Sequence, residues 1–253
     1  MKEAKPLMGT VITIEIADSG ADLGAMEKAF SYFRYVDEKF SPFKEESEIT
    51  KINQGKIAEE DWSEDMKEIF KLAEITKIET DGFFDIMADD GRINPSGIVK
   101  GWSIHNAARI LLDLRYKNFY VNAGGDIEAY GKNSREEPWS VGIKNPFNQE
   151  QIVKVLRLKN AGIATSGTYI RGQHIYNPFK RGEPITEIAS LTVIGPNAYE
   201  ADRFATACFA MGRDGIFFIE KLKGFEGYMI DKNGRSTYTS NFQKYIDPNK
   251  NEA

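Results

Sequence analysis

The sequence predicts an α+β fold, because strand-like and helix-like segments are both present and do not alternate regularly. Some segments show the two-residue alternation of strands, and others show the apolar spacing of helices. They lack the regular strand–helix–strand order of a parallel α/β protein. The chain of 253 residues also has no internal repeat and no linker long enough to divide it. We therefore expect one compact domain over residues 1–246, followed by a polar C-terminal tail over residues 247–253.

The first eighty residues are expected to form one strand and three helices. Residues 10–17 (TVITIEIA) alternate β-branched and polar side chains, which is typical of a strand. Residues 22–39 and 62–80 place apolar side chains at helical spacing and predict two amphipathic helices. Between them, Ser47 precedes a short helical segment and is suited to cap its N-terminus.

The remainder of the chain is expected to combine a long loop, two helices and several strands. Residues 81–101 (DGFFDIMADDGRINPSGIVKG) are rich in Gly and Asp and predict a loop. Residues 102–115 and 199–212 predict helices. The strands expected between these helices lie at residues 118–123, 139–144, 152–158 and 189–194. A further strand is expected at residues 227–231.

The composition excludes several functional classes. The net charge of -5 and the isoelectric point near 5.3 argue against a general nucleic-acid binder, which needs a basic surface. A phosphate ligand is still compatible, because a metal or a helix N-terminus can hold phosphate in an acidic protein. Cys208 is the only cysteine, which excludes an intrachain disulfide and a cysteine-based zinc site. The glycine motifs of Rossmann and P-loop nucleotide sites are also missing from the sequence.

The chain as given is expected to be cytoplasmic and to have no intrinsic membrane span. Its N-terminus (MKEAKPLMGT) lacks the apolar region of a signal peptide. No apolar run approaches the roughly 20 residues that a helix needs to cross a bilayer. A chain from which an export or lipoprotein signal had been removed would show the same sequence.

The helix predicted at residues 199–212 (YEADRFATACFAMG) carries two polar side chains on an otherwise small and apolar surface. Asp202 and Thr206 are four residues apart and therefore share one face of the helix. A buried aspartate without a partner would cost several kcal/mol, so Asp202 needs a cation. Aspartate and threonine oxygens are hard ligands that suit Mg²⁺. The spacing fits equally well a pairing of Asp202 with an arginine and a bond from Thr206 to the helix backbone.

Three other segments combine glycine with polar residues in a way that suggests a ligand. Residues 94–101 (NPSGIVKG) lead into a helix, so their backbone N–H groups and Lys100 could hold an anion. Residues 122–126 (NAGGD) follow a strand and indicate either an ordinary turn or a backbone held against a ligand. Residues 164–169 (ATSGTY) precede His174, one of two histidines. The alternatives are a solvated lysine, a plain turn and a structural histidine.

Eight short motifs follow one another in a fixed order along the chain. They are MGT (8–10), FSPF (40–43) with SEI (47–49) and Asn53, GFFD (82–85), SGIVKG (96–101), GGDI (124–127), TSG (165–167), HIYNP (174–178) and Ala201-Asp202 with Thr206. In this order they resemble the motifs of the ApbE family, the FAD:protein FMN transferases. The resemblance extends from Met8 to about Tyr228.

The resemblance implies a fold, two cofactors and a reaction. The fold would be a single α+β unit related to the T-fold, with mixed or antiparallel sheets and packed helices. The protein would bind FAD and a divalent cation, usually Mg²⁺. It would transfer the FMN part of FAD to a threonine or serine hydroxyl of an acceptor flavoprotein and release AMP. The expected partners are thus FAD and that acceptor protein.

The resemblance also implies which residues form the site. The cation would be bound by Asp202, Thr206 and the backbone carbonyl of Gly97. The flavin and the adenosine would contact Met8, Phe43, Phe83, Phe84, Asp85, Asn94, Lys100 and Tyr176. Phosphoryl transfer mainly requires positioning and charge neutralisation, which the metal and Lys100 would supply. His174, with an unperturbed pKa of about 6.5, would be the general base that accepts the proton of the attacking hydroxyl.

The sequence departs from the family pattern in four places. Met87 stands where the family usually has threonine, and Asn177 replaces an aspartate. Asn94 also replaces a usual aspartate, and the segment at residues 88–93 is shorter than is common. Because the last two departures lie at the expected adenosine side, we expect weaker adenosine recognition than is usual in the family.

Two other functions fit the same residues. A metal-dependent FAD pyrophosphatase would use water in place of the protein hydroxyl and would yield FMN and AMP. A non-catalytic flavin carrier would keep the fold without turnover. The presence of Asp202, Thr206 and His174 favours an enzyme over a carrier. The sequence leaves transfer and hydrolysis open, because one site could catalyse either reaction.

Overall fold

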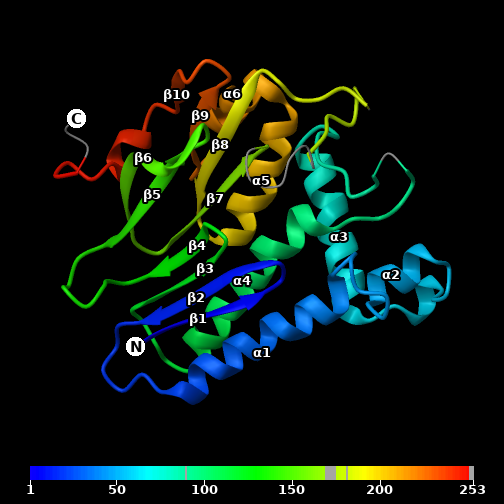
Figure 1. Ribbon diagram of the computed structural model, residues 1–253, viewed down its shortest axis with the longest axis horizontal. Coiled ribbons are helices and arrows are strands. Elements are labelled where there is room, and N and C mark those ends of the chain that lie inside the picture. The colour runs from blue at the N-terminus through cyan, green and yellow to red at the C-terminus, as the bar shows by residue number, and fades with distance from the viewer. Residues whose placement is uncertain (89, 169–174, 181, 251–253) are drawn as a thin grey trace.

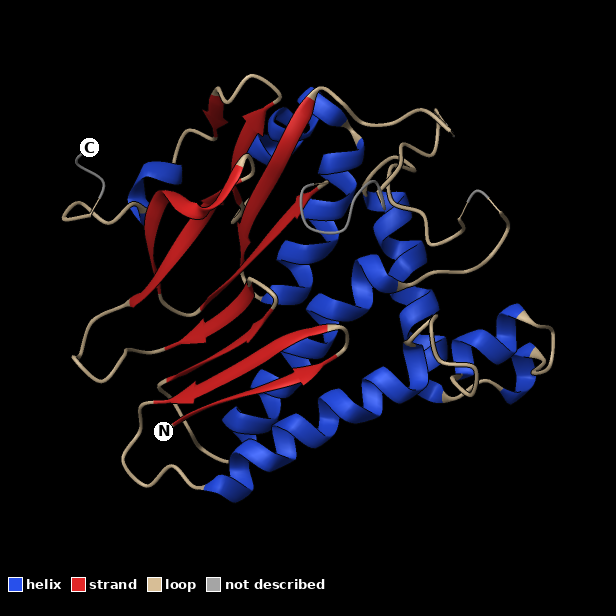
Figure 2. Cartoon of the chain, viewed as in Figure 1, coloured by secondary structure: helices blue, strands red, loops and turns tan. Residues whose placement is uncertain are grey.

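Strands and helices occupy separate layers in this protein. The computed structural model describes residues 1–88, 90–168, 175–180 and 182–250. Within these ranges the strands form two antiparallel sheets, and the longest helices lie along one face of the larger sheet (Figures 1 and 2). This arrangement confirms the α+β class predicted from the sequence.

The strands are β1 (Lys2–Leu7), β2 (Thr10–Ile16), β3 (Phe119–Ala123), β4 (Asp126–Tyr130), β5 (Trp139–Asn145), β6 (Asn148–Leu158), β7 (Ala161–Gly167), β8 (Ile188–Gly195), β9 (Glu226–Asp231) and β10 (Ser236–Tyr238). The α-helices are α1 (Leu23–Phe40), α2 (Glu48–Asn53), α3 (Glu64–Glu79), α4 (Ser96–Asp113), α5 (Ala198–Ala210) and α6 (Gly215–Lys221). Short 3-10 helices are η1 (Glu59–Asp61), η2 (Gly212–Asp214) and η3 (Phe242–Tyr245). The larger sheet has the order β1-β2-β3-β4-β7-β8-β9-β10, and β5 pairs with β6 in the smaller one.

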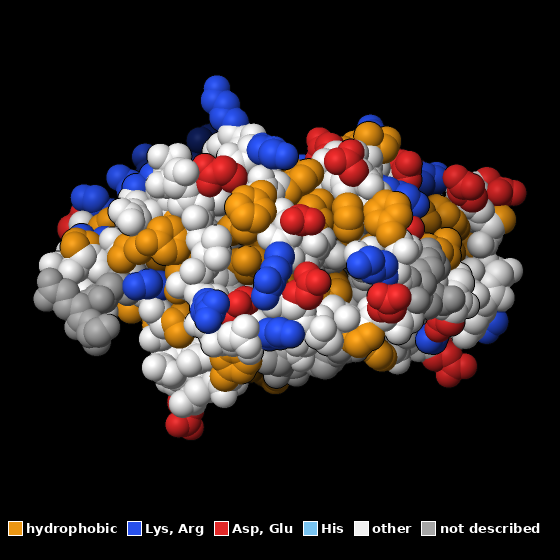
Figure 3. All heavy atoms as spheres, turned by 90° about the horizontal axis from the view of Figure 1, so that it is seen from above, with side chains coloured by type: hydrophobic (Ala, Val, Ile, Leu, Met, Phe, Trp, Pro, Cys, Tyr) orange, Lys and Arg blue, Asp and Glu red, His pale blue; other side chains and the backbone are white. Residues whose placement is uncertain are grey.

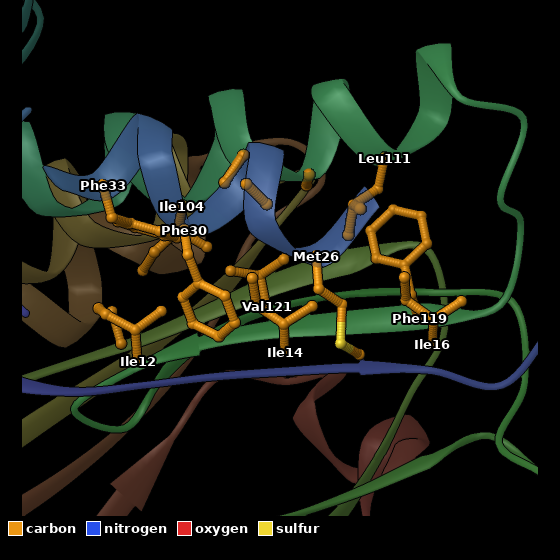
Figure 4. Close-up of a cluster of buried hydrophobic side chains, with 14 of the residues drawn as sticks. Ile12, Ile14, Ile16, Met26, Phe30, Phe33, Ile104, Leu111, Phe119 and Val121 are labelled. Atoms are coloured by element: carbon orange, nitrogen blue, oxygen red, sulfur yellow. The ribbon is translucent and has the colours of Figure 1, made fainter. Parts of the chain in front are cut away.

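Helices α1 and α4 cover the half of the larger sheet that contains β2 and β3. Phe30 and Phe33 of α1 and Ile104 of α4 pack against Ile14 of β2 and Val121 of β3, and all five side chains are fully buried (Figure 4). Alternation along β2 places its isoleucines on this face, as the sequence pattern predicts.

Helices α5 and α6 pack on the half of the sheet formed by β7, β8 and β9. Leu191 and Val193 of β8 lie in one apolar cluster with Phe209 of α5. The next residue of β8, Ile194, lies instead in the cluster that contains Leu156 of β6. The hairpin β5–β6 therefore covers the face of the sheet opposite to α5. Because α4 and α5 also contact each other, the two helices form a continuous layer.

The surface seen in Figure 3 mixes acidic, basic and apolar side chains. Lys and Arg side chains lie between Asp and Glu side chains on this face, with apolar patches among them. Among the helices of the described ranges, none is long and apolar enough to pass through a membrane.

Several predicted elements are confirmed. The strand at residues 10–17 is β2, and the helices at 22–39, 62–80 and 199–212 correspond to α1, α3 and α5. Ser47 caps the N-terminus of α2, as its position predicts.

The loop predicted over residues 81–101 is wrong at its C-terminal end. Helix α4 begins at Ser96, so Lys100 lies inside the helix and not in a loop. The side chain of Asn94 accepts a hydrogen bond from the N–H of Ser96 at 3.1 Å, and Ile98 is fully buried. This burial offsets the low helix propensity of the glycines in the segment.

Other elements escape the sequence pattern. Strands β1, β4, β7 and β10 and helix α6 are present but were not predicted. The edge strand β1 contains Pro6 and three charged residues, which is a weak strand signal. Strand β4 carries two buried carboxylates, Asp126 and Glu128, where alternation would predict apolar residues.

The segment expected to be a polar tail begins at a packed residue. Asp247 is buried, and its N–H donates to the carbonyl of Val155 in β6 at 2.9 Å. Its carboxylate lies 3.1 Å from the guanidinium of Arg157. The last three residues of the chain, 251–253, lie outside the described ranges.

Candidate active site

A pocket of about 880 Å³ lies beside the ends of strands β1, β3 and β7. This volume is within the range of small-molecule and cofactor sites. Each of the eight sequence motifs contributes at least one lining residue. The lining includes the residues Met8, Phe43, Phe83, Phe84, Asp85, Asn94, Gly97, Lys100, Tyr176, Asp202 and Thr206. These are all the described residues that the sequence predicts to bind the cofactor or the cation. His174, the predicted general base, lies outside the described residues.

Helix α5 brings Asp202 and Thr206 to the pocket on one face, as their spacing predicts. Asn197 precedes the helix, and its side chain accepts a hydrogen bond from the N–H of Glu200 at 2.9 Å, which fixes the start of α5. Asp202 is buried, with 2% of its surface exposed. Its carboxylate is thus held inside the protein at the pocket wall.

Helix α4 crosses α5 in close contact at Gly101. A Cβ atom at this position would lie 2.6 Å from both the carbonyl oxygen of Ala198 and the Cβ of Asp202, so only glycine fits. The N–H of Gly101 donates to Oδ2 of Asp202 at 2.8 Å. At the preceding turn, the hydroxyl of Thr206 donates to the carbonyl of Gly97 at 3.4 Å. The crossing therefore gathers a carboxylate, a hydroxyl and a backbone carbonyl from two helices.

Three charged side chains meet at the wall of the pocket, and we call them the pocket cluster: Lys100, Asp126 and Asp202. The ammonium of Lys100 lies 2.5 Å from Oδ2 of Asp126 and 3.4 Å from Oδ1 of Asp202. Burial raises the pKa of the Asp202 carboxyl, the positive charge of Lys100 acts in the opposite direction, and the negative charge of Asp126 raises it further. The pocket cluster thus combines two buried carboxylates with one cation.

The alternative in which Asp202 pairs with an arginine is wrong, because its cationic neighbour is Lys100. The next residue, Arg203, forms ion pairs with Glu79 of α3 and Glu200 of α5. Thr206 also donates across to α4 and not to the backbone of its own helix.

The aromatic residues predicted to contact flavin differ in their exposure. Phe43, in the turn between α1 and α2, is 94% exposed at the edge of the pocket. The ring of Phe83 packs edge-on against Phe179, with their centroids 4.9 Å apart. Phe84 is only 2% exposed and belongs to the apolar core between α1, α3 and α4. Phe43 and Phe83 are therefore better placed for stacking than Phe84.

The remaining predicted contacts are partly engaged in local structure. The hydroxyl of Tyr176 donates to the backbone carbonyls of Asp85 and Met87, which joins two motifs. The carboxylate of Asp85 lies 3.1 Å from the ammonium of Lys77 and accepts a hydrogen bond from the N–H of Met87. Asn94 shapes the start of α4, as described above. These contacts define the shape of one pocket wall.

Two carboxylates of β4 are important to the site and were given no role from the sequence. Asp126 contacts Lys100, and Glu128, fully buried, accepts a hydrogen bond from the N–H of Ala198 at 2.8 Å. Glu128 also lies 3.0 Å from Nδ1 of His105 in α4. Both acids face the helix layer because they are two residues apart on a strand, and this spacing is the signal that could have revealed them.

The oxygen groups at the crossing of α4 and α5 suit a hard divalent cation. Over the described part of the chain, no group of three or more His, Cys, Asp or Glu residues could hold a metal ion. The predicted set of Asp202, Thr206 and the Gly97 carbonyl needs only one carboxylate. A carboxylate, a hydroxyl and a carbonyl match the oxygen ligands of Mg²⁺, which also retains waters and binds substrate phosphates. The donor chemistry therefore fits the predicted metal.

The fold and the pocket define an α+β protein in which two buried carboxylates and a lysine of helix α4 line a cavity of cofactor size. The sequence matches the model of the ApbE family over residues 8–90 and 87–229. The chain therefore belongs to the ApbE family.

Relatives of known sequence match part of the chain. The FAD:protein FMN transferase of Haemophilus influenzae is 32% identical over 171 residues, which cover 62% of this chain and 49% of that protein. The FAD:protein FMN transferase of Escherichia coli K12 is 30% identical over 172 residues, which cover 63% and 49%. The alignments thus span about half the length of these curated relatives.

Solved structures match nearly the whole chain. The flavin transferase ApbE from Vibrio cholerae superposes with a TM-score of 0.84 at 22% identity and covers 97% of this chain and 98% of that one. The ApbE protein from Thermotoga maritima gives a TM-score of 0.85 at 23% identity, with coverage of 98% and 99%. At these identities the likeness establishes the fold alone.

Proposed function

We propose that the protein transfers the FMN part of FAD to a threonine or serine hydroxyl of an acceptor flavoprotein and releases AMP, with Mg²⁺ as the required cation. The observation that carries this proposal is the convergence of all eight motifs on one pocket. The relatives named FAD:protein FMN transferase support the same reaction.

The cation would be held by the carboxylate of Asp202, the hydroxyl of Thr206 and the carbonyl of Gly97. When bound, a divalent cation neutralises charge on the pyrophosphate of FAD.

Lys100 and the start of α4 supply the protein's own contribution to binding the pyrophosphate. Ser96, Gly97 and Lys100 line the pocket within the first turns of α4. N–H groups at a helix N-terminus and a lysine ammonium both attract phosphate oxygens. Lys100 would thus orient the pyrophosphate and balance part of its negative charge. Exposed Phe43 and half-buried Phe83 would contact the isoalloxazine ring.

The transfer step exchanges one P–O bond for another. The acceptor hydroxyl oxygen forms a bond to the FMN phosphorus, the bond from that phosphorus to the bridging oxygen breaks, and AMP leaves with that oxygen. The proton of the hydroxyl passes to a general base, for which we propose His174. Replacement of His174 by alanine would then lower the transfer rate by roughly two to four orders of magnitude and weaken FAD binding far less.

The experiment combines the protein, FAD, Mg²⁺ and a candidate acceptor, and measures AMP and acceptor-bound flavin fluorescence in the same samples. Transfer predicts equal amounts of AMP and protein-bound FMN. AMP accompanied by free FMN would identify a pyrophosphatase. Stoichiometric FAD binding without AMP, across acceptors modified by other members of the family, would identify a carrier.

A further inference from the structure

Asp126 is fixed in place by the sheet and presents one oxygen to the pocket. It is the first residue of β4, directly after the turn at Gly124 and Gly125, and only 3% of its surface is exposed. Its Oδ1 accepts a hydrogen bond from the N–H of Thr165 in β7 at 3.0 Å. Its Oδ2 is the atom that lies 2.5 Å from the ammonium of Lys100. One oxygen anchors the carboxylate, and the other binds the lysine.

Lys100 lies between two carboxylates and is closer to Asp126 than to Asp202, at 2.5 Å and 3.4 Å. The formal charge of the pocket cluster is -1, from two carboxylates and one ammonium. Both carboxylates are buried, so this surplus negative charge favours a further cation. An ammonium and a divalent cation on the same carboxylate would repel each other.

We propose that Asp126 is a positioning residue, which holds the ammonium of Lys100 and so leaves the carboxylate of Asp202 to the divalent cation. This role, which rests on the proposed function, makes Asp126 act through Lys100 and not by direct contact with the cation. Without the charge of Asp126, Lys100 would move toward Asp202 and compete with the metal there.

The test is a double-mutant cycle on metal affinity. Binding of Mn²⁺ is measured from the loss of the free-ion electron paramagnetic resonance signal. FAD is present at a concentration that saturates each variant, and acceptor is omitted. Wild type is compared with Asp126→Asn, Lys100→Met and the double variant. Asparagine keeps an oxygen for the N–H of Thr165, so Asp126→Asn removes the charge with little change in shape. If circular dichroism shows that Lys100→Met is not folded, Lys100→Gln is used in its place.

We expect Asp126→Asn to weaken Mn²⁺ binding by about tenfold in the wild-type background and by no more than about threefold when Lys100 is absent. Lys100→Met alone should bind Mn²⁺ at least as tightly as wild type. An equal effect of Asp126→Asn in both backgrounds would show that Asp126 acts through its own charge and would overturn the role. Failure of wild type to bind Mn²⁺ would overturn it too.

Asp37→Asn is the matched control, because Asp37 also lines the pocket but pairs with Lys44. It removes the same charge without touching Lys100 and should change Mn²⁺ affinity by less than about twofold. The transfer assay run in parallel separates the two proposals. If the effect of Asp126→Asn on Mn²⁺ affinity depends on Lys100 but no FMN is transferred, the role of Asp126 in metal binding is retained and the transferase function is rejected. If FMN is transferred but the effect of Asp126→Asn on Mn²⁺ affinity is the same with and without Lys100, only the role of Asp126 is rejected.

Discussion

Helix α5 takes part in two ion clusters through consecutive residues, Asp202 and Arg203. Each cluster joins one cation to two carboxylates. The pocket cluster consists of Lys100, Asp126 and Asp202. The second, which we call the arginine cluster, consists of Arg203, Glu79 and Glu200. Their formal charges are the same, so any difference in role must come from burial and surroundings.

The two clusters bury opposite charges. In the arginine cluster the side chain of Arg203 is 7% exposed, while those of Glu79 and Glu200 are 46% and 23% exposed. Arg203 also lies over the ring of Phe204, 4.1 Å from its centroid. Water therefore solvates the surplus negative charge of the arginine cluster. The cluster then needs no further cation, and its ion pair between Arg203 and Glu79 links α5 to α3.

In the pocket cluster the carboxylates are the buried groups. The side chains of Asp126 and Asp202 are 4% and 3% exposed, and that of Lys100 is 26% exposed. The surplus negative charge is kept from water and faces the motif-lined pocket. The comparison teaches that a carboxylate pair suits a cation when its charge is buried and exceeds that of the cation paired with it among the described residues.

The largest expected difference between the clusters is in catalysis. Asp202→Ala should lower AMP release by roughly a thousandfold or more, because it removes the only carboxylate of the predicted metal set. Glu79→Ala, its counterpart in the arginine cluster, should change the rate by less than about threefold. The rates are measured with saturating FAD and Mg²⁺, and circular dichroism checks the fold. Similar losses in both variants would remove the distinction between the clusters.

The next effect is on stability and should belong to the arginine cluster. Arg203→Ala should lower the free energy of unfolding by about 2–3 kcal/mol, since it removes a buried cation with two ion pairs and an aromatic contact. Urea unfolding followed by circular dichroism measures this change. A loss below about 0.5 kcal/mol would mean that the arginine cluster is not a structural link.

A third prediction concerns the energetic cost of the buried charge at Asp202. Its pKa is raised in the folded state, so its contribution to stability is fully present below the unfolded pKa of about 3.9 and is lost as the pH rises through the folded pKa. Asp202→Asn cannot ionise. Relative to wild type, the free energy of unfolding of Asp202→Asn should therefore increase by on the order of 1–2 kcal/mol as the pH is raised from about 4 to about 8. Urea unfolding in EDTA at both pH values measures this change. A decrease in the free energy of unfolding of Asp202→Asn relative to wild type over the same pH range would contradict the prediction.

The smallest expected effect is at the exposed edge of the arginine cluster. Glu79→Gln should change the free energy of unfolding by about 0.5 kcal/mol or less, because water screens an ion pair whose carboxylate is 46% exposed. A loss above about 2 kcal/mol would show that Glu79 is bound more tightly than its exposure indicates.

The resemblance to the ApbE motifs was sufficient to predict the described residues that line the pocket, because each motif is a short local segment and contributes at least one lining residue. The shared face of Asp202 and Thr206 follows from four-residue spacing on a helix and needs no tertiary information. The partner of Asp202 could not be predicted in this way. Lys100, Asp126 and Asp202 are far apart in the chain and meet only when α4, β4 and α5 pack together.

The errors in element prediction have related physical causes. The sequence pattern predicts a loop at the start of α4 because the glycines there disfavour helices, but Gly101 is required by the close approach of α5. The sequence pattern does not predict strand β4 because its acids interrupt the apolar alternation, yet those acids bind Lys100 and the start of α5. In both cases the tertiary contact that builds the site is what weakens the local signal.

The central claim is that the pocket cluster acts on FAD with a divalent cation at Asp202. The most direct test is to measure AMP release by the wild-type protein, with FAD and acceptor present, while Mg²⁺ is titrated from an EDTA-treated sample. The account predicts that wild type releases no AMP in EDTA and that AMP release rises to saturation as Mg²⁺ is added. In Asp202→Ala this increase should be absent at every Mg²⁺ concentration. AMP release that continues unchanged in EDTA would contradict it.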